Sequence, residues 1–458
     1  MSIMQKYMAI LSDMEERIRT GQYGPGRKLP SIREAASLYD CSRSTIIRAY
    51  AELERQHTIY AMPQSGYYVV DKRGEQWDVR ECERLDFTSA SPDLNIFPYL
   101  DFQHCLNKAI DTYQYHLFTY GDSQGLESFR NTLASHLASD QVFAKPDQIV
   151  VTSGVTQALM ILTQMPFPNH KSVILVEQPG YDIYLRYLEM EGAPVESILR
   201  TSKGIDLDRL EKLFKHGNIK FFFTMPRYQN PLGVSYNLAE RKAIVALAAK
   251  YDVYIVEDDY MGDLGSERRL HPLHSYDDAE HVIYLKSFSK IIFPGLRIGA
   301  AVVPRLLLPT FRMYKKYADS ESSLLSQAAL EIYIKNGMFE RHKHKIVKMY
   351  ASRMKAMNDA LLQHNASGIV EPTLVQSGVY IALQLENSVN MDQLIRRLAG
   401  REIVVVHSKG FYLTNYASPY KFLRLSITRV HKDVISASVY TLLEEIKKAN
   451  QNAGRKRL

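Results

Sequence analysis

Short apolar runs that alternate with helical stretches place the strongest limit on the fold of this 458-residue chain. Each run holds three or four apolar residues, and stretches of helical character, such as residues 238–250, separate them. This alternation is typical of a buried parallel sheet whose strands are joined by crossover helices. The runs occupy residues 149–151, 173–176, 221–223, 253–256 and 282–285. We therefore expect an α/β fold with a large, mostly parallel lobe, followed after about residue 325 by a smaller α+β lobe.

A polar segment divides the chain into two regions of different character. Residues 71–85 read DKRGEQWDVRECERL, with many charges and no helical or strand periodicity. We interpret this segment as a linker between an N-terminal domain, residues 1–70, and a larger domain, residues 86–450. Because the linker is short and has no Gly/Ser repeat, it would keep the two domains within limited reach of each other.

Composition excludes several classes of protein. With 46% hydrophobic and 23% charged residues, the chain reads as an ordinary globular protein. Cys41, Cys82 and Cys105 form no CxxC pair and are interpreted as reduced packing residues. The N-terminus has no signal-peptide pattern and no run of 18 apolar residues occurs, so we expect a cytoplasmic protein without membrane contact. The net charge of +7 says little about partners, because residues 405–458 alone hold ten basic and three acidic residues.

The N-terminal region predicts three short helices and a hairpin. Residues 4–19 have the apolar spacing of an amphipathic helix. Ser31 and Glu34 form a capping box that opens a second helix ending at Leu38, and Ser42 caps a third helix through Arg55. Residues 59–70 read as two short strands around a turn. The side chains expected to face inward are Met4, Met8, Ile10, Leu11, Met14 and Ile18 in the first helix, and Ile46, Ile47, Tyr50 and Leu53 in the third.

The second and third helices, joined by a tight turn at residues 39–41, fit a helix-turn-helix whose recognition helix enters the major groove by its N-terminus. Arg43 and Arg48 would reach guanine edges or phosphates, and Arg33 the flanking backbone. Five basic and two acidic residues lie between positions 27 and 48, where DNA would lie. Taken alone, outward Arg and Ser side chains are also typical of a solvated helix. The predicted DNA-binding residues are Arg33, Ser42, Arg43, Ser44, Thr45 and Arg48.

The order of the N-terminal motifs resembles a known family. The pattern G-x-x-L-P-S-x-R-E-A-A, from Gly26, is followed by S-R-S-T-x-x-R-A-Y-x-E-L, from Ser42, and by the hairpin. Over residues 5–70 this order resembles the GntR-type winged helix-turn-helix, which implies binding to a double-stranded DNA operator. The wing departs from the family pattern. Residues 62–66 read MPQSG where the family usually has Arg-Pro-Gly-Ser-Gly, so Met62 and Gln64 replace Arg and Gly.

Lys290 stands in the densest group of chemically useful residues. It closely follows an apolar run, with Ser287 just before it and Arg297 seven residues later. A lysine in this setting can form a Schiff base while its neighbours hold a phosphate. Asp258 follows another apolar run and offers a carboxylate that can keep a pyridine nitrogen protonated. Backbone N–H groups in the strand-to-helix turn of residues 152–156 can bind phosphate.

Three further residues complete the pattern. Asn230 offers an amide in a tight turn, Tyr181 an aromatic ring that can stack on a planar ligand, and Arg424 a guanidinium suited to a bidentate grip on a carboxylate. The chain order of all these fragments resembles the fold-type I aminotransferases, which use pyridoxal 5'-phosphate (PLP), over about residues 86–450. That resemblance implies the corresponding fold, with a large α/β lobe and a small α+β lobe.

The resemblance also implies a role for each residue. Lys290 forms the PLP Schiff base, Asp258 bonds the pyridine nitrogen, Tyr260 and Asn230 bond the ring hydroxyl, and Tyr181 stacks on the ring. Arg297, Ser287 and the turn of Gly154, Val155 and Thr156 hold the phosphate, while Arg424 holds a carboxylate of the substrate or effector. Tyr120 matches a position that reaches the phosphate of the neighbouring subunit, which implies a homodimer. Lys290, Asp258 and Tyr260 form the predicted catalytic set.

Metal binding is the alternative chemistry for the acidic pair Asp258 and Asp259. Two histidine pairs, His271 with His274 and His342 with His344, offer further ligands. We expect surface histidines and no metal site. The chain also has no Walker loop and no G-x-G-x-x-G motif that opens a βαβ unit.

A GntR-type reader joined to an aminotransferase-like domain is the architecture of the MocR-type regulators, and the similarity spans nearly the whole chain. It implies a transcription regulator that senses an amino acid, an amine or PLP itself through a small-molecule effector site. That family includes sensors of γ-aminobutyrate, taurine and D-alanine. Two alternatives stay open. One is an active PLP-dependent aminotransferase that carries a DNA-binding module, and the other is a binding module with a dead pocket. A residual transaminase half-reaction also stays open for the regulator itself.

Overall fold

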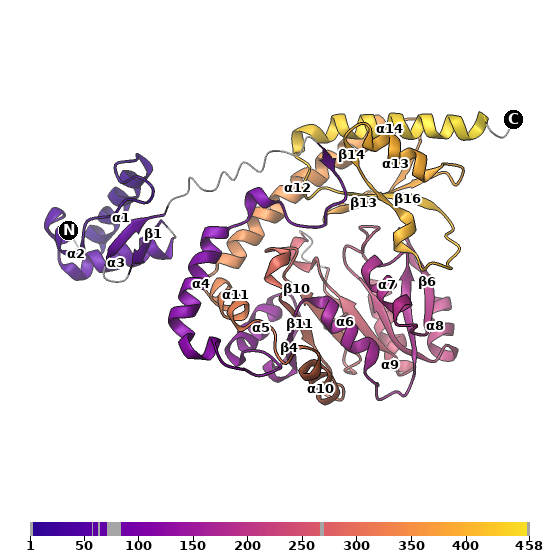
Figure 1. The fold of residues 1–458 in the computed structure, drawn as a ribbon, viewed down its shortest axis with the longest axis horizontal. Helices are drawn as coiled ribbons and strands as arrows, with labels where there is room; N and C mark the ends of the chain where they lie inside the picture. The colour runs from indigo at the N-terminus through magenta and orange to yellow at the C-terminus, as the bar shows by residue number, and fades with distance from the viewer. Residues whose placement is uncertain (1–2, 57, 63–64, 71–83, 266–269, 456–458) are drawn as a thin grey trace. The chain divides into compact units, whose positions relative to one another are not determined.

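The computed structural model describes residues 3–56, 58–62, 65–70, 84–265 and 270–455 (Figure 1). The chain divides into two compact units, Met1–Cys82 and Glu83–Leu458, which are described separately here. Most of the expected linker, residues 71–83, lies outside the described residues, as do Cys82 within it and the wing residues Pro63 and Gln64. No helix in the described ranges is long and apolar enough to cross a membrane.

The first unit contains three helices and a two-stranded sheet, in the order that the sequence predicts. Helices α1 (Ile3–Arg19), α2 (Ile32–Leu38) and α3 (Arg43–Arg55) precede the antiparallel strands β1 (Ile59–Met62) and β2 (Gly66–Val69). Ser31 and Glu34 form the expected capping box at the start of α2. At the start of α3, Ser42 Oγ accepts a hydrogen bond from the Thr45 amide at 3.3 Å. Both predicted helix starts are therefore confirmed.

A single hydrophobic core holds the first unit, and two residues predicted to belong to it do not. The buried core side chains are Ile10, Leu11, Met14, Leu29, Ala35, Ile46, Ala49, Tyr50, Leu53, Ile59 and Val69. Met8 is 58% exposed and Ile47 is 49% exposed, so their expected inward orientation is wrong. Successive helical residues are turned by about 100°, which places Ile47 outside the stripe that begins at Ile46. Met8 lies off the stripe of Ile10 and Met14 for the same reason.

The second unit is built on an eight-stranded sheet with the order β4-β11-β10-β9-β8-β5-β6-β7. Strands β10, β9, β8, β5 and β6 are mutually parallel, whereas β11 runs antiparallel to both β10 and β4. The strands are β4 (Ile149–Thr152), β5 (Val173–Gln178), β6 (Val195–Thr201), β7 (Gly204–Ile205), β8 (Ile219–Thr224), β9 (Tyr254–Asp258), β10 (Val282–Ser287) and β11 (Gly299–Val302). Each of the five predicted apolar runs overlaps a strand, and the mostly parallel α/β lobe is confirmed.

Helices cover both faces of this sheet. On one face, α8 (Leu207–His216) and α9 (Leu238–Lys250) share an apolar cluster with β5, β8 and β9. On the other face, α6 (Val155–Gln164) and α7 (Asp182–Met190) pack on alternate residues of the same strands. Because these strands are buried on both sides, they read as continuous apolar runs rather than as alternating patterns.

The rest of the second unit includes the predicted smaller α+β lobe. Its antiparallel sheet has the order β12-β13-β16-β15, and β3 pairs in parallel with β14 beside it. These strands are β3 (Leu85–Asp86), β12 (Glu371–Pro372), β13 (Tyr380–Leu385), β14 (Ile403–Val404), β15 (Val406–His407) and β16 (Lys421–Ser426). The remaining helices are α4 (Tyr99–Tyr113), α5 (Glu127–Ser139), α10 (Leu308–Asp319), α11 (Leu324–Lys335), α12 (Met338–His364), α13 (Met391–Ala399) and α14 (Lys432–Arg455). Short 3-10 turns are η2 (Leu94–Ile96), η3 (Gln114–Leu117), η4 (Pro146–Gln148), η5 (Gly262–Leu264), η6 (Leu273–Tyr276), η7 (Pro294–Leu296) and η8 (Ser408–Phe411).

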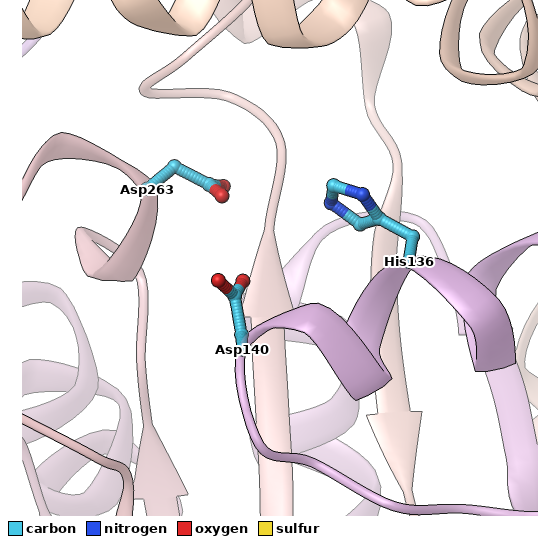
Figure 2. A group of neighbouring side chains, drawn as sticks. All are labelled: His136, Asp140 and Asp263. Carbon is cyan, nitrogen blue, oxygen red and sulfur yellow. The ribbon is translucent and has the colours of Figure 1, made fainter. Parts of the chain in front are cut away.

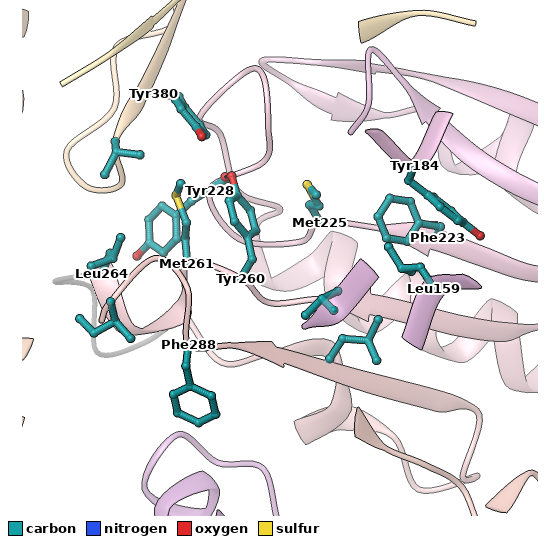
Figure 3. Close-up of a cluster of buried hydrophobic side chains, with 14 of the residues drawn as sticks. Leu159, Tyr184, Phe223, Met225, Tyr228, Tyr260, Met261, Leu264, Phe288 and Tyr380 are labelled. Atoms are coloured by element: carbon teal, nitrogen blue, oxygen red, sulfur yellow. The ribbon is translucent and has the colours of Figure 1, made fainter. Parts of the chain in front are cut away.

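One apolar cluster extends from the large lobe into the small lobe. Figure 3 shows Tyr184 and Phe223 at one end of the drawn cluster, and Tyr260 with Tyr380 of β13 at the other. The backbones of the two lobes also approach closely at Gly233. A Cβ atom at this position would lie 2.1 Å from the Tyr380 carbonyl oxygen, and the φ angle of +76° also favours glycine. The two lobes therefore share a core close to the carboxyl ends of the central strands.

Candidate functional site

The expected ligand-binding residues lie at the carboxyl ends of neighbouring strands. Asp258 ends β9 and Ser287 ends β10, and these strands are parallel neighbours. Asn230 follows β8 and Tyr181 follows β5, the next two strands along the sheet. Parallel strands present their carboxyl ends at one edge, which is where open α/β sheets bind ligands. The strand order thus gathers residues that are far apart in the chain.

Asp258 is a buried carboxylate with an unfilled hydrogen bond. Its Oδ1 is buried and has no hydrogen-bond partner among the described residues. Burial, together with the neighbouring Asp259 carboxylate, raises the pKa of Asp258 to about 8, although the Lys290 ammonium opposes this rise. A cationic donor placed against Oδ1 would favour the ionised form of Asp258.

The Lys290 amine is an electrostatic neighbour of Asp258. Burial and the Arg424 guanidinium lower the pKa of Lys290 to about 8, and Asp258 works in the opposite direction. Lys290 in turn lowers the pKa of Asp258, so each side chain affects the other. A lysine with this pKa is partly unprotonated near neutral pH and can act as a nucleophile.

We expect the reactivity of Lys290 towards acetic anhydride to follow a titration near pH 8. Only the neutral amine reacts, so the labelling rate should rise about tenfold per pH unit below pH 8 and level off above it. In a lysine-containing model peptide the rise should continue to about pH 10.4. Pulsed labelling at a series of pH values, with mass spectrometry of the Lys290 peptide, measures the profile. A labelling profile identical to that of the model peptide would contradict the lowered pKa of Lys290.

Gly154 and Arg297 form a cradle at the start of α6. Gly154 is the N-cap residue, with φ of +85° and no side-chain cap. The Gln157 amide bonds back to the Gly154 carbonyl at 3.2 Å, so the first two amides of the helix, those of Val155 and Thr156, are the ones that can meet an anion. Arg297 Nη2 donates a hydrogen bond to the Ser153 carbonyl at 2.9 Å. If residue 154 had a Cβ atom, that atom would lie only 2.9 Å from the same Nη2, so the guanidinium packs closely against Gly154. Ser287 is paired with Gly299 of β11, which is itself paired with the end of β4. The structure therefore brings the helix turn, Arg297 and the Ser287 strand end into one neighbourhood.

Arg424 joins the small lobe to this neighbourhood. It lies on β16, and its Nη1 donates to Asn230 Oδ1 at 2.9 Å while Nη2 donates to the Thr88 carbonyl at 2.7 Å. Its Nε is buried without a hydrogen-bond partner among the described residues. The guanidinium carbon lies 4.5 Å from the ring centre of Tyr380 and 5.1 Å from that of Phe411. Arg424 thus keeps an unused donor beside two aromatic rings, as a carboxylate-binding arginine requires.

The three residues expected to contact a ligand ring are engaged by protein groups in this structure. The Tyr260 hydroxyl donates to the Tyr228 carbonyl at 2.9 Å, and Asn230 accepts the bond described above. The Tyr181 side chain packs against the main hydrophobic core. These interactions hold the side chains around the site, and their contacts to a ring stay predictions.

Tyr120 is not brought to the other site residues within a single chain. It follows η3, its side chain is 92% exposed, and the nearby Tyr115 and Phe118 are also exposed. The amide of the next residue, Gly121, donates to the Glu321 carboxylate and anchors this segment. The contact of Tyr120 with a neighbouring subunit therefore also stays a prediction.

Helices α2 and α3 present most of the expected DNA-binding side chains to solvent. Arg33, Ser42, Arg43, Ser44 and Arg48 are exposed, while Thr45 is half-buried. The Ser42 hydroxyl lies 2.8 Å from the hydroxyls of both Ser44 and Thr45, which orders the start of α3. Ile47, one turn after Arg43, shares this exposed face. The Tyr50 hydroxyl donates to the Pro30 carbonyl at 2.7 Å and ties α3 to the residues before α2.

Two family models match the chain at places that agree with this geometry. The model described as aminotransferase class I and II matches residues 93–436, and that of the bacterial regulatory proteins, gntR family, matches residues 6–69. The chain belongs to the class I and II aminotransferase family. Its N-terminal unit is a GntR-type DNA-binding domain. The architecture expected from the motifs, a GntR reader joined to an aminotransferase domain, is confirmed.

Transcriptional regulators and a solved aminotransferase are both similar to this aminotransferase-family regulator. An uncharacterized HTH-type transcriptional regulator of Bacillus subtilis, YcxD, is 44% identical over 97% of this chain and 100% of its own. The Escherichia coli regulator YdcR is 28% identical over 89% of this chain and 92% of its own. Among solved structures, kynurenine aminotransferase of Pyrococcus horikoshii matches 82% of this chain and 94% of its own, with a TM-score of 0.74 and 27% identity. The protein is therefore a DNA-binding regulator with an aminotransferase-like domain.

PLP is the cofactor that the aminotransferase family implies, and the residues of this regulator fit it. The unpartnered Oδ1 of Asp258 suits a protonated pyridine nitrogen, which needs a buried acceptor. The cradle of Gly154 and Arg297 at a helix N-terminus suits a phosphate. Lys290 supplies an amine that loses its proton near pH 8. The donor set therefore matches the chemical groups of PLP.

An ion pair behind Asp258 was not predicted. Arg227 Nε donates to Asp259 Oδ1 at 2.8 Å, and the Tyr284 hydroxyl donates to Asp259 Oδ2 at 2.7 Å. All three side chains are buried. Both oxygens of Asp259 are thus bonded, whereas Asp258 Oδ1 has no hydrogen-bond partner among the described residues. The adjacent carboxylates of Asp258 and Asp259 are a signal in the sequence, because two buried carboxylates require a positive charge nearby. The sequence does not show that Arg227 supplies this charge.

A second group of titratable side chains lies apart from this site. His136, Asp140 and Asp263 point towards one another (Figure 2), with potential ligand atoms within 4.8 Å of one another. Lys286 Nζ lies 3.1 Å from Asp140 and 2.8 Å from Asp263, and Lys343 Nζ lies 3.6 Å and 3.3 Å from the same carboxylates. Although burial raises the pKa of Asp263, the two ammonium groups hold it below its usual value. The group is a neutralised ion-pair cluster rather than a vacant set of metal ligands.

One histidine expected at the surface is buried. His342, on α12, is 5% exposed, and its Nε2 lies 2.8 Å from the Ile291 carbonyl. Burial lowers its pKa to about 4, so the ring is neutral at physiological pH. The expectation of a surface position was wrong. The hydrogen bond between one ring nitrogen and a backbone carbonyl offsets the free-energy cost of burying the imidazole.

Proposed function

We propose that this regulator holds PLP and senses a small amino compound with an acidic group, and that occupation of the pocket changes its affinity for a DNA operator. The observation that carries the proposal is the meeting of Lys290, Asp258 and Arg424 in one region, where each affects the ionisation of Lys290. A reactive amine, a buried carboxylate and an arginine with a free donor form a receptor for such a compound.

The tasks of the residues follow from their positions. PLP supplies a carbonyl carbon at which one amine can replace another. Asp258 would accept a hydrogen bond from the pyridine nitrogen, and Arg297 with the Gly154 turn and Ser287 would hold the phosphate. Lys290 would provide the resident amine, and its Nζ would hold a proton when it is not attached to the cofactor. Residues Val155, Thr156, Tyr181, Asn230 and Tyr260 complete the expected cofactor site.

Arg424 gives the pocket its selectivity for acids. Its free Nε and its Nη nitrogens offer parallel donors to a carboxylate, and the surrounding rings of Tyr380 and Phe411 exclude water from that contact. Asn230 orients the guanidinium through its Oδ1. An acidic amino compound would therefore be held at both ends, by its amine near Lys290 and by its acid group at Arg424.

A second copy of the chain completes the site in this proposal. Tyr120, Tyr115 and Phe118 form a group of exposed aromatic residues on one short segment. Exposed aromatic clusters of this kind are unusual on isolated surfaces and mark contact sites. In a homodimer, this segment would place Tyr120 at the phosphate of the neighbouring subunit.

Active transamination is the second candidate. The same four groups, Lys290, Asp258, Asn230 and Arg424, are sufficient parts for it. An aromatic-amino-acid aminotransferase of Thermococcus litoralis is 27% identical over 81% of this chain and 89% of its own. Release of an oxo acid separates this candidate from a sensor, which keeps the amino compound intact.

The proposed sensing can be tested with the full chain, PLP and an operator obtained by DNA selection. The test compounds are γ-aminobutyrate, taurine, D-alanine and the common L-amino acids. At least one should shift the absorbance of the bound cofactor and change the operator Kd by about fivefold or more, without release of an oxo acid. If no PLP absorbance stays with the protein after unbound PLP is removed, the cofactor is excluded. Steady release of oxo acid with an unchanged operator Kd would favour the enzyme.

A further inference from the structure

The segment that enters the second unit passes directly beside Arg424. Residues 84–90, here called the strap, are the first part of this unit that the structure describes. The strap amides of Leu85 and Phe87 donate to the carbonyls of Glu402 and Val404 at 2.7 and 3.0 Å. The chain before the strap continues, through residues 71–83, into the DNA-binding unit. The strap is therefore the place where the covalent connection from the DNA-binding unit enters the second unit.

Strand β16 binds the strap at three successive points. The Ser426 amide donates to the Phe87 carbonyl at 2.9 Å, and the Thr428 hydroxyl, just past the strand, donates to the Ser89 carbonyl at 2.9 Å. Between these two bonds, Arg424 Nη2 donates to the Thr88 carbonyl at 2.7 Å. The third contact differs from the others because its donor also belongs to the proposed ligand pocket.

A carboxylate bound at Arg424 would share the guanidinium with the Thr88 carbonyl. The guanidinium already donates to Asn230 and to Thr88, which leaves Nε as its unpartnered nitrogen. A bidentate grip uses two nitrogens of the guanidinium, so Nε must act together with Nη1 or Nη2. A carboxylate is a stronger acceptor than a neutral amide carbonyl. Each Nη nitrogen carries two hydrogens, so a carboxylate gripped through Nε and one Nη would share that nitrogen with Asn230 Oδ1 or the Thr88 carbonyl and would draw the guanidinium towards itself.

Asp86 fixes Thr88 for this contact. Its Oδ1 accepts hydrogen bonds from both the amide of Thr88, at 2.8 Å, and its hydroxyl, at 2.5 Å. The local turn holds the Thr88 carbonyl against Arg424, while the backbone of Asp86 pairs with Val404 in β14. Asp86 does not touch the proposed ligand pocket itself. It acts through Thr88 and is a positioning residue.

We infer that the strap transmits the state of the Arg424 pocket to the connection with the DNA-binding unit, and that Asp86 gives this link its stiffness. The inference rests on the proposed function, since it needs an acid group that binds at Arg424. It adds two statements to that function. The strap connects the Arg424 site to the DNA-binding unit, and the bound acid group, rather than the exchange of amines, alters DNA binding.

Two small probes separate the trigger from the cofactor chemistry. Aminooxyacetate and methoxyamine both replace the Lys290 amine at the PLP carbonyl carbon and release that amine, but only aminooxyacetate carries a carboxylate. With the holo-protein, both should change the cofactor absorbance. We expect aminooxyacetate alone to change the operator Kd, by about fivefold or more. It alone should also change the rate of amide hydrogen exchange in the strap.

Each other outcome has a definite meaning. Equal changes of the operator Kd with both probes would show that the carboxylate is not the trigger and would overturn the inference. Altered absorbance without any change in operator Kd or strap exchange would overturn it as well, while the cofactor assignment stands. If neither probe changes the absorbance, the proposed function itself fails, and the inference fails with it.

Variants of Asp86 test the positioning role. Asp86→Ala removes the acceptor for Thr88, whereas Asp86→Asn keeps an oxygen at this place and is the matched control. Operator affinity without a probe should stay within about twofold of the parent for both variants. The response to aminooxyacetate should shrink by about twofold or more in Asp86→Ala and survive in Asp86→Asn. A full response in Asp86→Ala, with an unchanged absorbance shift, would refute the role of Asp86. Hydrogen exchange on the parent chain tests the strap even if Asp86→Ala does not fold.

Discussion

Lys290→Ala is expected to abolish covalent attachment of PLP and with it the response to an amino compound. In the parent, borohydride reduction should leave a phosphopyridoxyl group on Lys290, detected by mass spectrometry of its peptide. The variant should carry none. Because Arg297, Ser287 and the Gly154 turn remain, folding and basal operator affinity should stay within about twofold of the parent. Only the exchange of amines is lost.

The control for this experiment is Lys203→Ala, which removes an exposed lysine on the turn between β6 and β7. It should label and respond like the parent. Labelling of another lysine in the parent would refute the assignment of Lys290. A normal response in Lys290→Ala would mean that the compound is sensed without covalent exchange. Loss of basal DNA binding would mean that attachment of the cofactor is needed for folding.

Arg43→Ala and Arg48→Ala are each expected to weaken operator binding by about 1–3 kcal/mol if the arginines make bidentate contacts to guanine. If they contact phosphates, the loss should be equal for all DNA sequences, and the salt dependence of binding should flatten. Fluorescence anisotropy with operator and scrambled DNA, at several salt concentrations, distinguishes the two cases.

Arg55→Ala is the matched control on the same helix. Arg55 lies at the far end of α3, and its Nη2 is 2.5 Å from Glu52 Oε1 on the exposed surface. An exposed pair of this kind contributes little to stability, so operator affinity should hardly change. If Arg43→Ala and Arg48→Ala both bound like the parent, α3 would not be the reading element.

The sequence predicts those features that depend on neighbours along the chain. Ser31 and Ser42 mark helix starts because a side-chain hydroxyl caps the amide three residues later, and both caps are present. The central strands are predicted because burial on both faces demands apolar residues throughout. The strand ends at Asp258 and Ser287 follow from these runs, and parallel pairing then brings them together.

Features that depend on distant partners could not be predicted in the same way. The neighbours of Arg424 come from residues 88, 230, 380 and 411, and no local pattern joins them. The same holds for Arg227 with Asp259, and for His342 with the Ile291 carbonyl. Ile47 was misplaced for a different reason. An apolar residue next to the buried stripe of a helix cannot be assigned to core or surface until the packed neighbour is known.

The ion-pair cluster of Lys286, Lys343, Asp140 and Asp263 constrains how this family of sequences can diverge. Loss of one charged member leaves an uncompensated buried charge, which costs about 3–5 kcal/mol, a large share of the stability of a domain. Replacement of the whole set by apolar residues of similar volume can be nearly neutral. The four residues lie at the C-cap of α5, in η5, on β10 and on α12. We therefore expect homologues to retain all four charges or to lose them together. Co-variation among these four positions should exceed that of their uncharged neighbours.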